Sequence, residues 1–408
     1  MRESWRQRRR VGVYREMTLS SGLRGVLLAV LLVVSLAGCG DSGVDPDKLD
    51  VGSYSTEVRK QENLQPLPTD GTVLEGIRMS DAVADTSQFD SPLVYLWQAD
   101  PVPDPASLTP VLGEAGRGVL EQNGFVAGYR AAYADRPQLD DGSTPPEYVG
   151  LAILLLRFRD DAAAQAAAAG LEVSNWKDFE QTVAAPLPEH PEVVARYTPG
   201  TGALVADTAI GPFVLHLMIE ATPDGIERRV GDLDPVVDIE RELIKNFQPT
   251  PIADLPKLPR DPDGLLAKMV ATDPERWPPP SGAFAVYGAV GALRGQTAGM
   301  RRDKLFEKWG VEHLAVSGNQ QLYVARDHDS AVAMQEEFTA ELAGLGSQVD
   351  SDGQIPDQRC FKVEKAAPDA PGFACQFVYE NMYTIVRANT SSSVKQMAAA
   401  QYALFANG

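Results

Sequence analysis

YVGLAILLLRFRDDAAAQAAAAGL, residues 148–171, sets the expectation for the fold of this chain. Residues 148–158 are short, continuous and apolar, which is the pattern of a buried strand. Arg159, Asp160 and Asp161 follow, and an aspartate before an alanine-rich stretch is typical of a helix N-cap. The stretch therefore predicts a strand and then a capped helix over 162–171, which Gly170 ends or interrupts.

The segments around this pair extend it into a larger unit. Prolines between 101 and 110 exclude a regular element there. The other predicted elements are read from apolar periodicity and turn residues. They are a helix end, a turn at Gly124 and an apolar segment over 120–134, two strands at 202–209 and 212–220 joined by a turn at Gly211-Pro212, and a helix at 235–247.

The same order recurs in the second half of the chain. Leu156 aligns with Val324 at a separation of 168, and Phe213 aligns with Tyr383 at a separation of 170. A nearly constant separation predicts an internal duplication, and the alternative is chance recurrence of a common order of elements. The repeated segments are 305–316, a strand at 322–325, a helix at 330–345 opened by Arg326 to Asp329, two strands at 373–378 and 382–388, and a helix at 394–405.

The predicted fold class is α+β, with two related units. Each unit is expected to be an antiparallel sheet with helices on one face, as in ferredoxin-like domains. The first unit, with an N-terminal extension, covers 49–247, a proline-rich linker covers 248–281, and the second unit covers 282–408. Two sheets side by side would leave a cleft between them, where ligands usually bind.

The N-terminal stretch VLLAVLLVVSLAGC, residues 26–39, predicts export. It is too short for a membrane-spanning helix, which needs roughly 20 residues, and arginines precede it as in a secretory signal. Its end, Leu36-Ala37-Gly38-Cys39, resembles the bacterial lipobox. The resemblance implies that residues 1–38 are a signal peptide, that Cys39 carries the lipid, and that the protein is held at the outer face of the cell membrane.

Residues 39–48 follow as a flexible tether, since glycine, serine and aspartate dominate them. Two alternatives for the N-terminus remain open. One is an ordinary signal peptide with an incidental cysteine, and the other is twin-arginine export directed by Arg8 to Arg10. Translation starting at Met17 would give a signal of more usual length.

Two phrases follow the lipobox at short distance: LDVGSYST, residues 49–56, and LEGIRMSD, residues 74–81. With the lipobox they resemble a family of actinobacterial envelope lipoproteins, of mycobacterial and nocardial type, whose function is unknown. The resemblance covers most of the chain after residue 38. It implies an extracytoplasmic location and contributes no catalytic residues.

Charge and cysteine content narrow the possible partners. The chain has net charge −19, and seven arginines and two glutamates lie in residues 1–38, which leaves −24 on the remainder. An acidic chain repels phosphate backbones, so nucleic acid is not an expected partner. Cys360 and Cys375 are predicted to form a disulfide in an oxidising compartment. A redox or metal pair is the weaker alternative, because CxxC spacing and a nearby histidine are both absent.

Residues that carry chemistry are sparse in this sequence. The triplet Asp327-His328-Asp329 comes nearest to a metal cluster and is better read as a helix cap; His216 lies in an apolar strand, and the glycines of 288–295 suit close packing. The acidic pairs Asp140-Asp141 and Asp160-Asp161 suit solvated surfaces. We therefore expect no catalytic residue, metal or cofactor, and predict non-catalytic binding of a small molecule or a protein partner.

The alternative is a cell-envelope hydrolase whose active site has no sequence motif. It requires His216, His313 or His328 to converge in space with an acid or a serine.

Overall fold

The computed structural model describes residues 44–64, 67–89, 91–139, 143–295, 308–364 and 370–407. The predicted signal peptide, its lipid site Cys39, and the pair Asp140-Asp141 lie outside these ranges. Contacts group residues 43–408 into one unit. Within the described ranges, no helix combines the length and the apolar character needed to cross a membrane.

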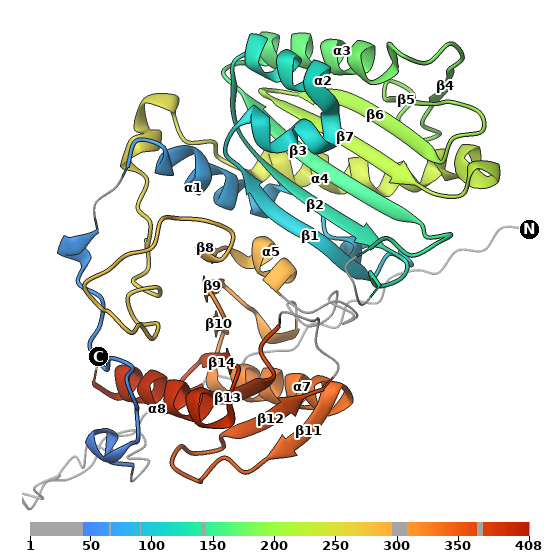
Figure 1. Ribbon diagram of the computed structural model, residues 1–408. Helices are drawn as coiled ribbons and strands as arrows, with labels where there is room; N and C mark the ends of the chain where they lie inside the picture. The colour runs from blue at the N-terminus through green and yellow to red at the C-terminus, as the bar shows by residue number, and fades with distance from the viewer. Residues whose placement is uncertain are drawn as a thin grey trace, which may run out of the picture. The chain divides into compact units, whose positions relative to one another are not determined.

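The first half forms an antiparallel sheet of seven strands in the order β1-β2-β3-β7-β6-β5-β4 (Figure 1). Strands β1 to β3 form a meander, helix α3 (Asp161–Trp176) leads to the far edge, and four strands return until β7 pairs with β3. The strands are β1 (Tyr95–Val102), β2 (Phe125–Ala134), β3 (Gly150–Phe158), β4 (Val183–Pro186), β5 (Val194–Tyr197), β6 (Ala203–Ile210) and β7 (Phe213–Glu220).

The second half repeats this topology in the order β8-β9-β10-β14-β13-β12-β11. Helix α7 (His328–Leu345) takes the place of α3, and α8 (Ser391–Asn407) takes the place of α4 (Asp234–Asn246). The sequence repeat is therefore present as a repeat of strand order. The strands are β8 (Phe284–Tyr287), β9 (His313–Ser317), β10 (Gln320–Val324), β11 (Gly346–Val349), β12 (Arg359–Val363), β13 (Phe373–Tyr379) and β14 (Met382–Ala388).

The predicted alignment of the two halves is wrong by one residue. Phe158 N donates to Pro212 O at 2.8 Å, and the equivalent bond in the second half joins Ala325 N to Asn381 O at 2.9 Å. Residue 158 thus matches 325, a separation of 167, and residue 212 matches 381, a separation of 169. The correction matters because a shift of one residue moves every side chain of a strand to the other face.

Helices cover both faces of each sheet, so the expected arrangement on one face is wrong. In the first half, α2 (Thr109–Gln122) and α3 pack on one face, and α1 (Asp70–Met79) and α4 pack on the other. In the second half, α7 and α8 lie on opposite faces. The physical reason is in residues 153–158 of β3, which are all buried: a strand with apolar residues on both faces needs cover on both.

Two local predictions also fail for identifiable reasons. Helix α3 continues past Gly170 to Trp176, and a Cβ at Gly170 would lie 2.8 Å from Val119 of α2, so this glycine lets two helices approach closely. Strand β1 forms despite Pro101 because it is an edge strand, where a missing N–H breaks no ladder.

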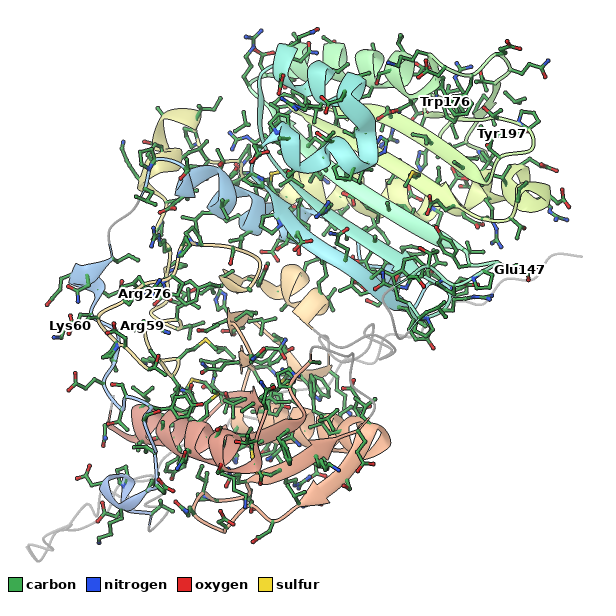
Figure 2. All side chains as sticks on the ribbon, viewed as in Figure 1. Arg59, Lys60, Glu147, Trp176, Tyr197 and Arg276 are labelled. Atoms are coloured by element: carbon green, nitrogen blue, oxygen red, sulfur yellow. A yellow bond between two sulfur atoms is a disulfide. The ribbon has the colours of Figure 1, made fainter. Side chains whose placement is uncertain are left out.

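The N-terminal segment contacts the second half, although its residues 49–59 were assigned to the first unit. Asp50 Oδ2 accepts from Gln396 Nε2 at 3.1 Å, and buried Arg59 donates to Leu266 O at 2.7 Å. Figure 2 shows Arg59 beside Lys60 in this segment. The last residues of the predicted tether, Pro46–Lys48, form a single 3-10 turn.

Two buried acids of α1 fasten the proline-rich linker to the first half. Asp70 Oδ2 accepts from Arg260 Nε at 2.9 Å. Glu75 Oε1 accepts from Thr250 N at 3.0 Å and pairs with Arg157 of β3. The linker is therefore part of the packed structure at these points.

Candidate functional site

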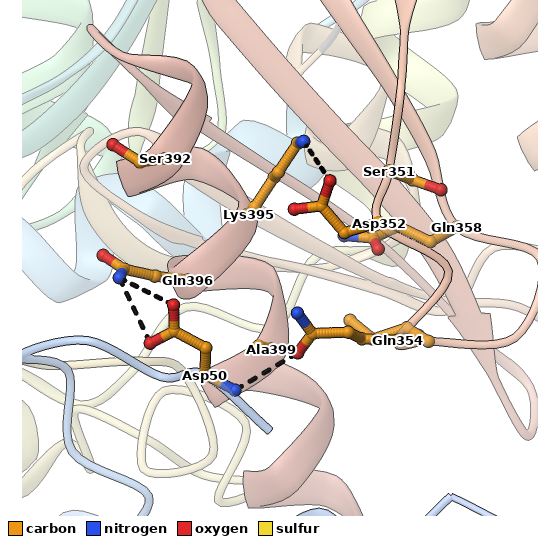
Figure 3. Close-up of a pocket in the computed structure, with 10 residues that line it drawn as sticks. Asp50, Ser351, Asp352, Gln354, Gln358, Ser392, Lys395, Gln396 and Ala399 are labelled. Carbon is orange, nitrogen blue, oxygen red and sulfur yellow. Dashed lines mark hydrogen bonds and ion pairs between the residues drawn. The ribbon is translucent and has the colours of Figure 1, made fainter. Parts of the chain in front are cut away.

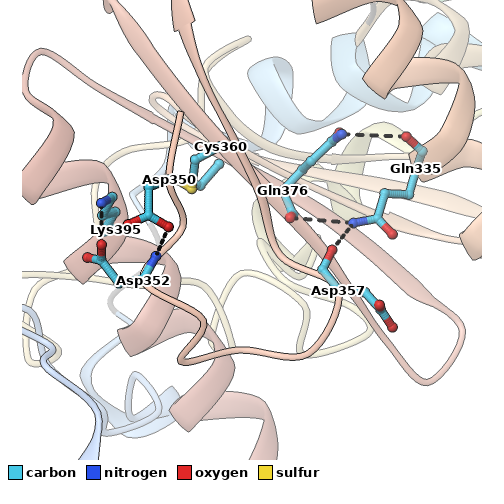
Figure 4. Close-up of a disulfide and its surroundings, with 8 residues drawn as sticks. Gln335, Asp350, Asp352, Asp357, Cys360, Gln376 and Lys395 are labelled. Carbon is cyan, nitrogen blue, oxygen red and sulfur yellow. Dashed lines mark hydrogen bonds and ion pairs between the residues drawn. A yellow bond between two sulfur atoms is a disulfide. The ribbon is translucent and has the colours of Figure 1, made fainter. Parts of the chain in front are cut away.

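The predicted disulfide is confirmed. Cys360 on β12 and Cys375 on β13 lie directly opposite each other, with Cα atoms 4.1 Å apart and both side chains buried (Figure 4). Beside them, Gln335 of α7 donates to Asp357 O at 2.8 Å. The bond joins two neighbouring strands of the second sheet and has a structural role.

The predicted helix caps are also confirmed. Asp327 Oδ1 accepts from Ser330 N at 2.8 Å, and Asp160 Oδ1 accepts from Ala163 N at 2.8 Å. His328 hydrogen-bonds Glu380 O through Nδ1 instead of joining Asp327 in a ligand set. In the described part of the chain, no group of three or more histidine, cysteine or acidic side chains is placed to hold a metal ion.

Gly288 and Gly291 of the stretch 288–295 serve close packing, as predicted. A Cβ at Gly288 would lie 2.0 Å from Asp81 Oδ2, and one at Gly291 would lie 2.1 Å from Ser80 Oγ. Asp81 Oδ1 accepts from Gly291 N at 2.7 Å. The segment is thus held against the loop that follows α1.

His216 has an acidic partner that sequence spacing did not reveal. Its Nδ1 lies 2.8 Å from Asp207 Oδ1 on the neighbouring strand β6, and both side chains are 2% exposed. Asn175 of α3 donates to Asp207 Oδ2 at 2.8 Å. His216 Nε2 is buried without a hydrogen-bond partner in the described structure. Two of the other histidines contact acids at more exposed positions: His190 contacts Asp238 and His313 contacts Asp263.

His216 belongs to a row of residues that crosses five strands. Strand register pairs Asp100 with Arg130, Arg130 with Leu154, Leu154 with His216, and His216 with Asp207. Residues paired directly across a sheet share one face, here the face covered by α2 and α3. The row therefore places an Asp–Arg pair on one side of Leu154 and a His–Asp pair on the other.

A pocket of about 160 Å³ opens on this same face. Its rim is formed by Trp97 and Tyr148, whose ring centroids are 4.9 Å apart, and Glu147, labelled in Figure 2, precedes this rim. Trp97 sits where the register between β1 and β2 shifts, and such bulges re-aim side chains. Among the residues that line the pocket are Val111, Ala152, Leu154, Met218, Arg130 and Glu220.

The pocket is apolar with one polar group near each end. Tyr148 donates its hydroxyl to Glu220, and burial, with this bond, raises the pKa of Tyr148. Arg130 lies four residues along its strand from Ala134, which shares a row with Gly150 and Glu220. At about 3.3 Å per residue, the two polar ends are therefore about 13 Å apart along the strands. A pocket of this kind suits a small apolar molecule with a polar end.

A second pocket, of about 80 Å³, lies where the N-terminal segment meets α8 (Figure 3). Its polar side chains pair with one another: Lys395 with Asp352 at 2.6 Å, and Gln396 with Asp50. Asp50 N also donates to Gln354 Oε1 at 3.2 Å. These bonds fasten the N-terminal segment to α8 and to the loop before β12, so we assign the polar groups of this pocket a structural role.

A group of buried ionisable residues lies where the two halves meet. Arg294 donates to Tyr133 Oη at 3.1 Å and to Ala84 O at 2.9 Å. Glu240 of α4 is fully buried, and its Oε1 accepts from Ala84 N at 2.7 Å. Burial raises the pKa of Glu240 to about 8, so this side chain holds a proton near neutral pH. The bonds of Arg294 to Tyr133 and Ala84 join the two halves, which indicates a structural role for this group.

Two family models match the chain, both described as domain of unknown function (DUF7373): the N-terminal model over residues 63–260 and the C-terminal model over 265–408. The chain belongs to the DUF7373 family. The gap between the two matches falls inside the predicted linker 248–281. Comparison with curated proteins and with solved structures finds no match.

The pocket and the polar row both lie in the DUF7373 N-terminal domain, and sequence reasoning missed most of their residues. The expected cleft between two sheets is not where this pocket lies. One signal was available: Arg130 interrupts the otherwise apolar segment FVAGYRAAYA of β2, and a charge inside such a segment marks a buried polar site.

Proposed function

We propose that this chain is a lipid-anchored cell-envelope protein that binds a small, largely apolar molecule without transforming it. The pocket on the first sheet carries the proposal. It combines an aromatic rim, Trp97 and Tyr148, with an apolar floor that includes Leu154 and Met218. Its volume of about 160 Å³ is close to that of an apolar cavity, about 150 Å³, that accommodates benzene.

Filling the pocket tests the proposal. Ala152 lines it and is partly exposed, so Ala152→Phe adds a ring at little cost to the core, and Ala152→Ser is a control of nearly unchanged volume. Native mass spectrometry of protein purified from an envelope extract should show an added mass on the wild type and on Ala152→Ser, and none on Ala152→Phe. An added mass that survives on Ala152→Phe would locate the ligand elsewhere.

The anchor rests on the lipobox-like residues 36–39 after the apolar run. Two or three acyl chains hold a protein stably at a membrane, since burial contributes about 0.8 kcal/mol per CH₂. Replacing Cys39 by serine should release the protein into the soluble fraction. Unchanged membrane retention of Cys39→Ser would overturn the anchor.

A hydrolase is the second candidate, because His216 does converge with an acid, Asp207. In the described structure no hydroxyl or thiol hydrogen-bonds His216 Nε2, so the nucleophile would have to be water. Turnover of small aryl esters by the wild type, lost in His216→Gln, would favour this candidate. The binding proposal expects no difference in turnover between the two proteins.

A further inference from the structure

We propose that the ligand is a carboxylic acid whose carboxyl group lies over Leu154, between Arg130 and His216. The inference rests on the proposed function and names the chemical class of its ligand. It follows from two nitrogen atoms, one on each side of Leu154, that are buried and have no hydrogen-bond partner in the described part of the chain: Arg130 Nε and His216 Nε2.

Arg130 lines the pocket and supplies a fixed positive charge at the end opposite Glu220. Its side chain is 22% exposed, and its contact with Asp100 is a single hydrogen bond at 3.4 Å through Nη2. The Nε–H therefore remains to be satisfied, and buried donors in folded proteins nearly always are. Arginine binds carboxylates through Nε and Nη together, and the Nη2 that shares an edge with Nε holds Asp100 only by this long contact.

His216 supplies the second contact. It is not among the residues that line the pocket, but it adjoins two that do: Leu154 directly across the sheet, and Met218 two residues along β7 on the same face. Asp207 carries an acceptor 2.8 Å from Nδ1, so Nδ1 bears the hydrogen and Nε2 has the lone pair in the neutral ring. A carboxylic acid donates its O–H to that lone pair, or transfers the proton and then accepts a bond from the imidazolium. In both forms a single proton lies between a carboxyl oxygen and Nε2, and no other atom is exchanged.

The spacing across the sheet fits one carboxyl group. Arg130 and His216 are the cross-strand neighbours of Leu154, so their Cα atoms are about 10 Å apart at about 4.8 Å per strand. A planar group bridging two side chains, with a hydrogen bond of about 2.8 Å on each side, spans this distance. Glu220, the acid among the residues that line the pocket, lies at its far end and accepts a hydrogen bond from the Tyr148 hydroxyl, so it does not face the proposed carboxyl position.

The second sheet shows that this arrangement is not a requirement of the fold. The positions equivalent to Arg130 and His216 are Val316 and Ile385, which flank Gln321 in the same way. The same topology therefore forms without either nitrogen. Because the remaining pocket is apolar and the size of one ring, the predicted ligand class is a carboxylic acid with a compact hydrophobic body.

Benzoate and benzyl alcohol test the inference separately from the proposed function, since both carry the ring and only benzoate carries the carboxyl group. Binding is measured by ligand-observed NMR on residues 43–408, which form one unit. The variants are Arg130→Met, His216→Gln, which keeps a donor for Asp207, and the control Val316→Met at the equivalent position of the second sheet. Thermal melting checks that each variant folds.

We expect the wild type and Val316→Met to bind benzoate at least tenfold more tightly than benzyl alcohol. Arg130→Met should lose that preference and still bind benzyl alcohol, and His216→Gln should weaken benzoate alone. Equal binding of both probes to the wild type would overturn the carboxylate inference and leave the pocket intact. Binding of neither probe would overturn the pocket as well. If Arg130→Met melts early, unchanged benzoate preference in His216→Gln still contradicts the inference.

Discussion

Across the first sheet, the row through Leu154 consists of Asp100, Arg130, Leu154, His216 and Asp207. The equivalent row of the second sheet consists of Ala285, Val316, Gln321, Ile385 and Gln376. Strand order is the same in both sheets, and the pairing of these five positions across the strands is equivalent. Four ionisable side chains in the first row thus correspond to none in the second, so ionisable groups in this row are a property of one half of the chain.

The two halves also fill the next row differently. Leu156 and Val214 of the first sheet correspond to Tyr323 and Tyr383 of the second. There the two tyrosine rings pack against Phe338 of α7, with centroids 5.7 and 4.9 Å from it, and against each other at 5.8 Å. Aromatic rings fill this face of the second sheet. On the first sheet the side chains are smaller, and the same face is covered by α2 and α3 and contains the pocket. We infer that the second half stabilises the chain and the first half holds the ligand.

The largest effect is expected where the first half buries a charge pair. Glu75 is inaccessible and bonds Arg157, Arg78 and Thr250, so Glu75→Ala leaves the buried Arg157 without its ion-pair partner, although Arg157 still donates to Thr250 O. Breaking such a pair costs about 3–5 kcal/mol of unfolding free energy. Urea unfolding measures it, with the exposed Glu114→Ala as the control, expected within about 0.5 kcal/mol of the wild type. Equal midpoints for the two variants would contradict this role of Glu75.

Glu240 should make the free energy of unfolding depend on pH. Burial raises its pKa from 4.5 to about 8 in the folded state, so folded protein keeps a proton that unfolded protein releases. The stability this proton provides is present below about pH 4.5 and is lost as the pH rises to about 8. Between pH 4.5 and 7 the wild type should lose about 3 kcal/mol relative to Glu240→Gln, at about 1.4 kcal/mol per unit. Parallel curves of unfolding free energy against pH would contradict this account.

The disulfide tests whether the second sheet stabilises the chain without taking part in ligand binding. Cys360 and Cys375 are 15 residues apart, and in the chain-entropy model closing such a loop contributes about 3 kcal/mol. The double variant Cys360→Ala, Cys375→Ala should unfold at lower urea concentration, and the wild type treated with dithiothreitol should match it. Ligand binding by the first sheet should be unchanged below the transition. Loss of binding in the folded double variant would show that the two halves do not divide the work in this way.

The sequence predicts most of the regular elements and little of the site. Apolar runs and aspartate caps identify β3, β7, α3 and α7 because each signal is local to a few residues. Short strands such as β4, β5 and β11 are missed, since four residues carry no periodicity and form only through pairing with a neighbour.

The polar row is missed for a different reason. Asp100, Arg130 and His216 are far apart in the sequence, and only strand register brings them to one face of one sheet. The continuous apolar run of β3 did indicate how the sheet is covered. Its residues are buried on both faces, which is why helices pack on both faces of the sheet.

The smallest expected effect compares the halves where they are alike. Asp160 and Asp327 cap α3 and α7 with the same hydrogen bond, at 2.8 Å in each case. Removing a cap destabilises a helix modestly, so Asp160→Ala and Asp327→Ala should each lower Tm by a few degrees, and by similar amounts. Calorimetry on the two variants measures this, and Asp329→Ala, two residues after the cap in the first turn of α7, is the control. Helix α3 also carries Asn175, which bonds Asp207. If fraying at the start of α3 reached the pocket, Asp160→Ala alone would weaken benzoate binding, whereas unchanged binding in both variants would show that the cap and the polar row are independent.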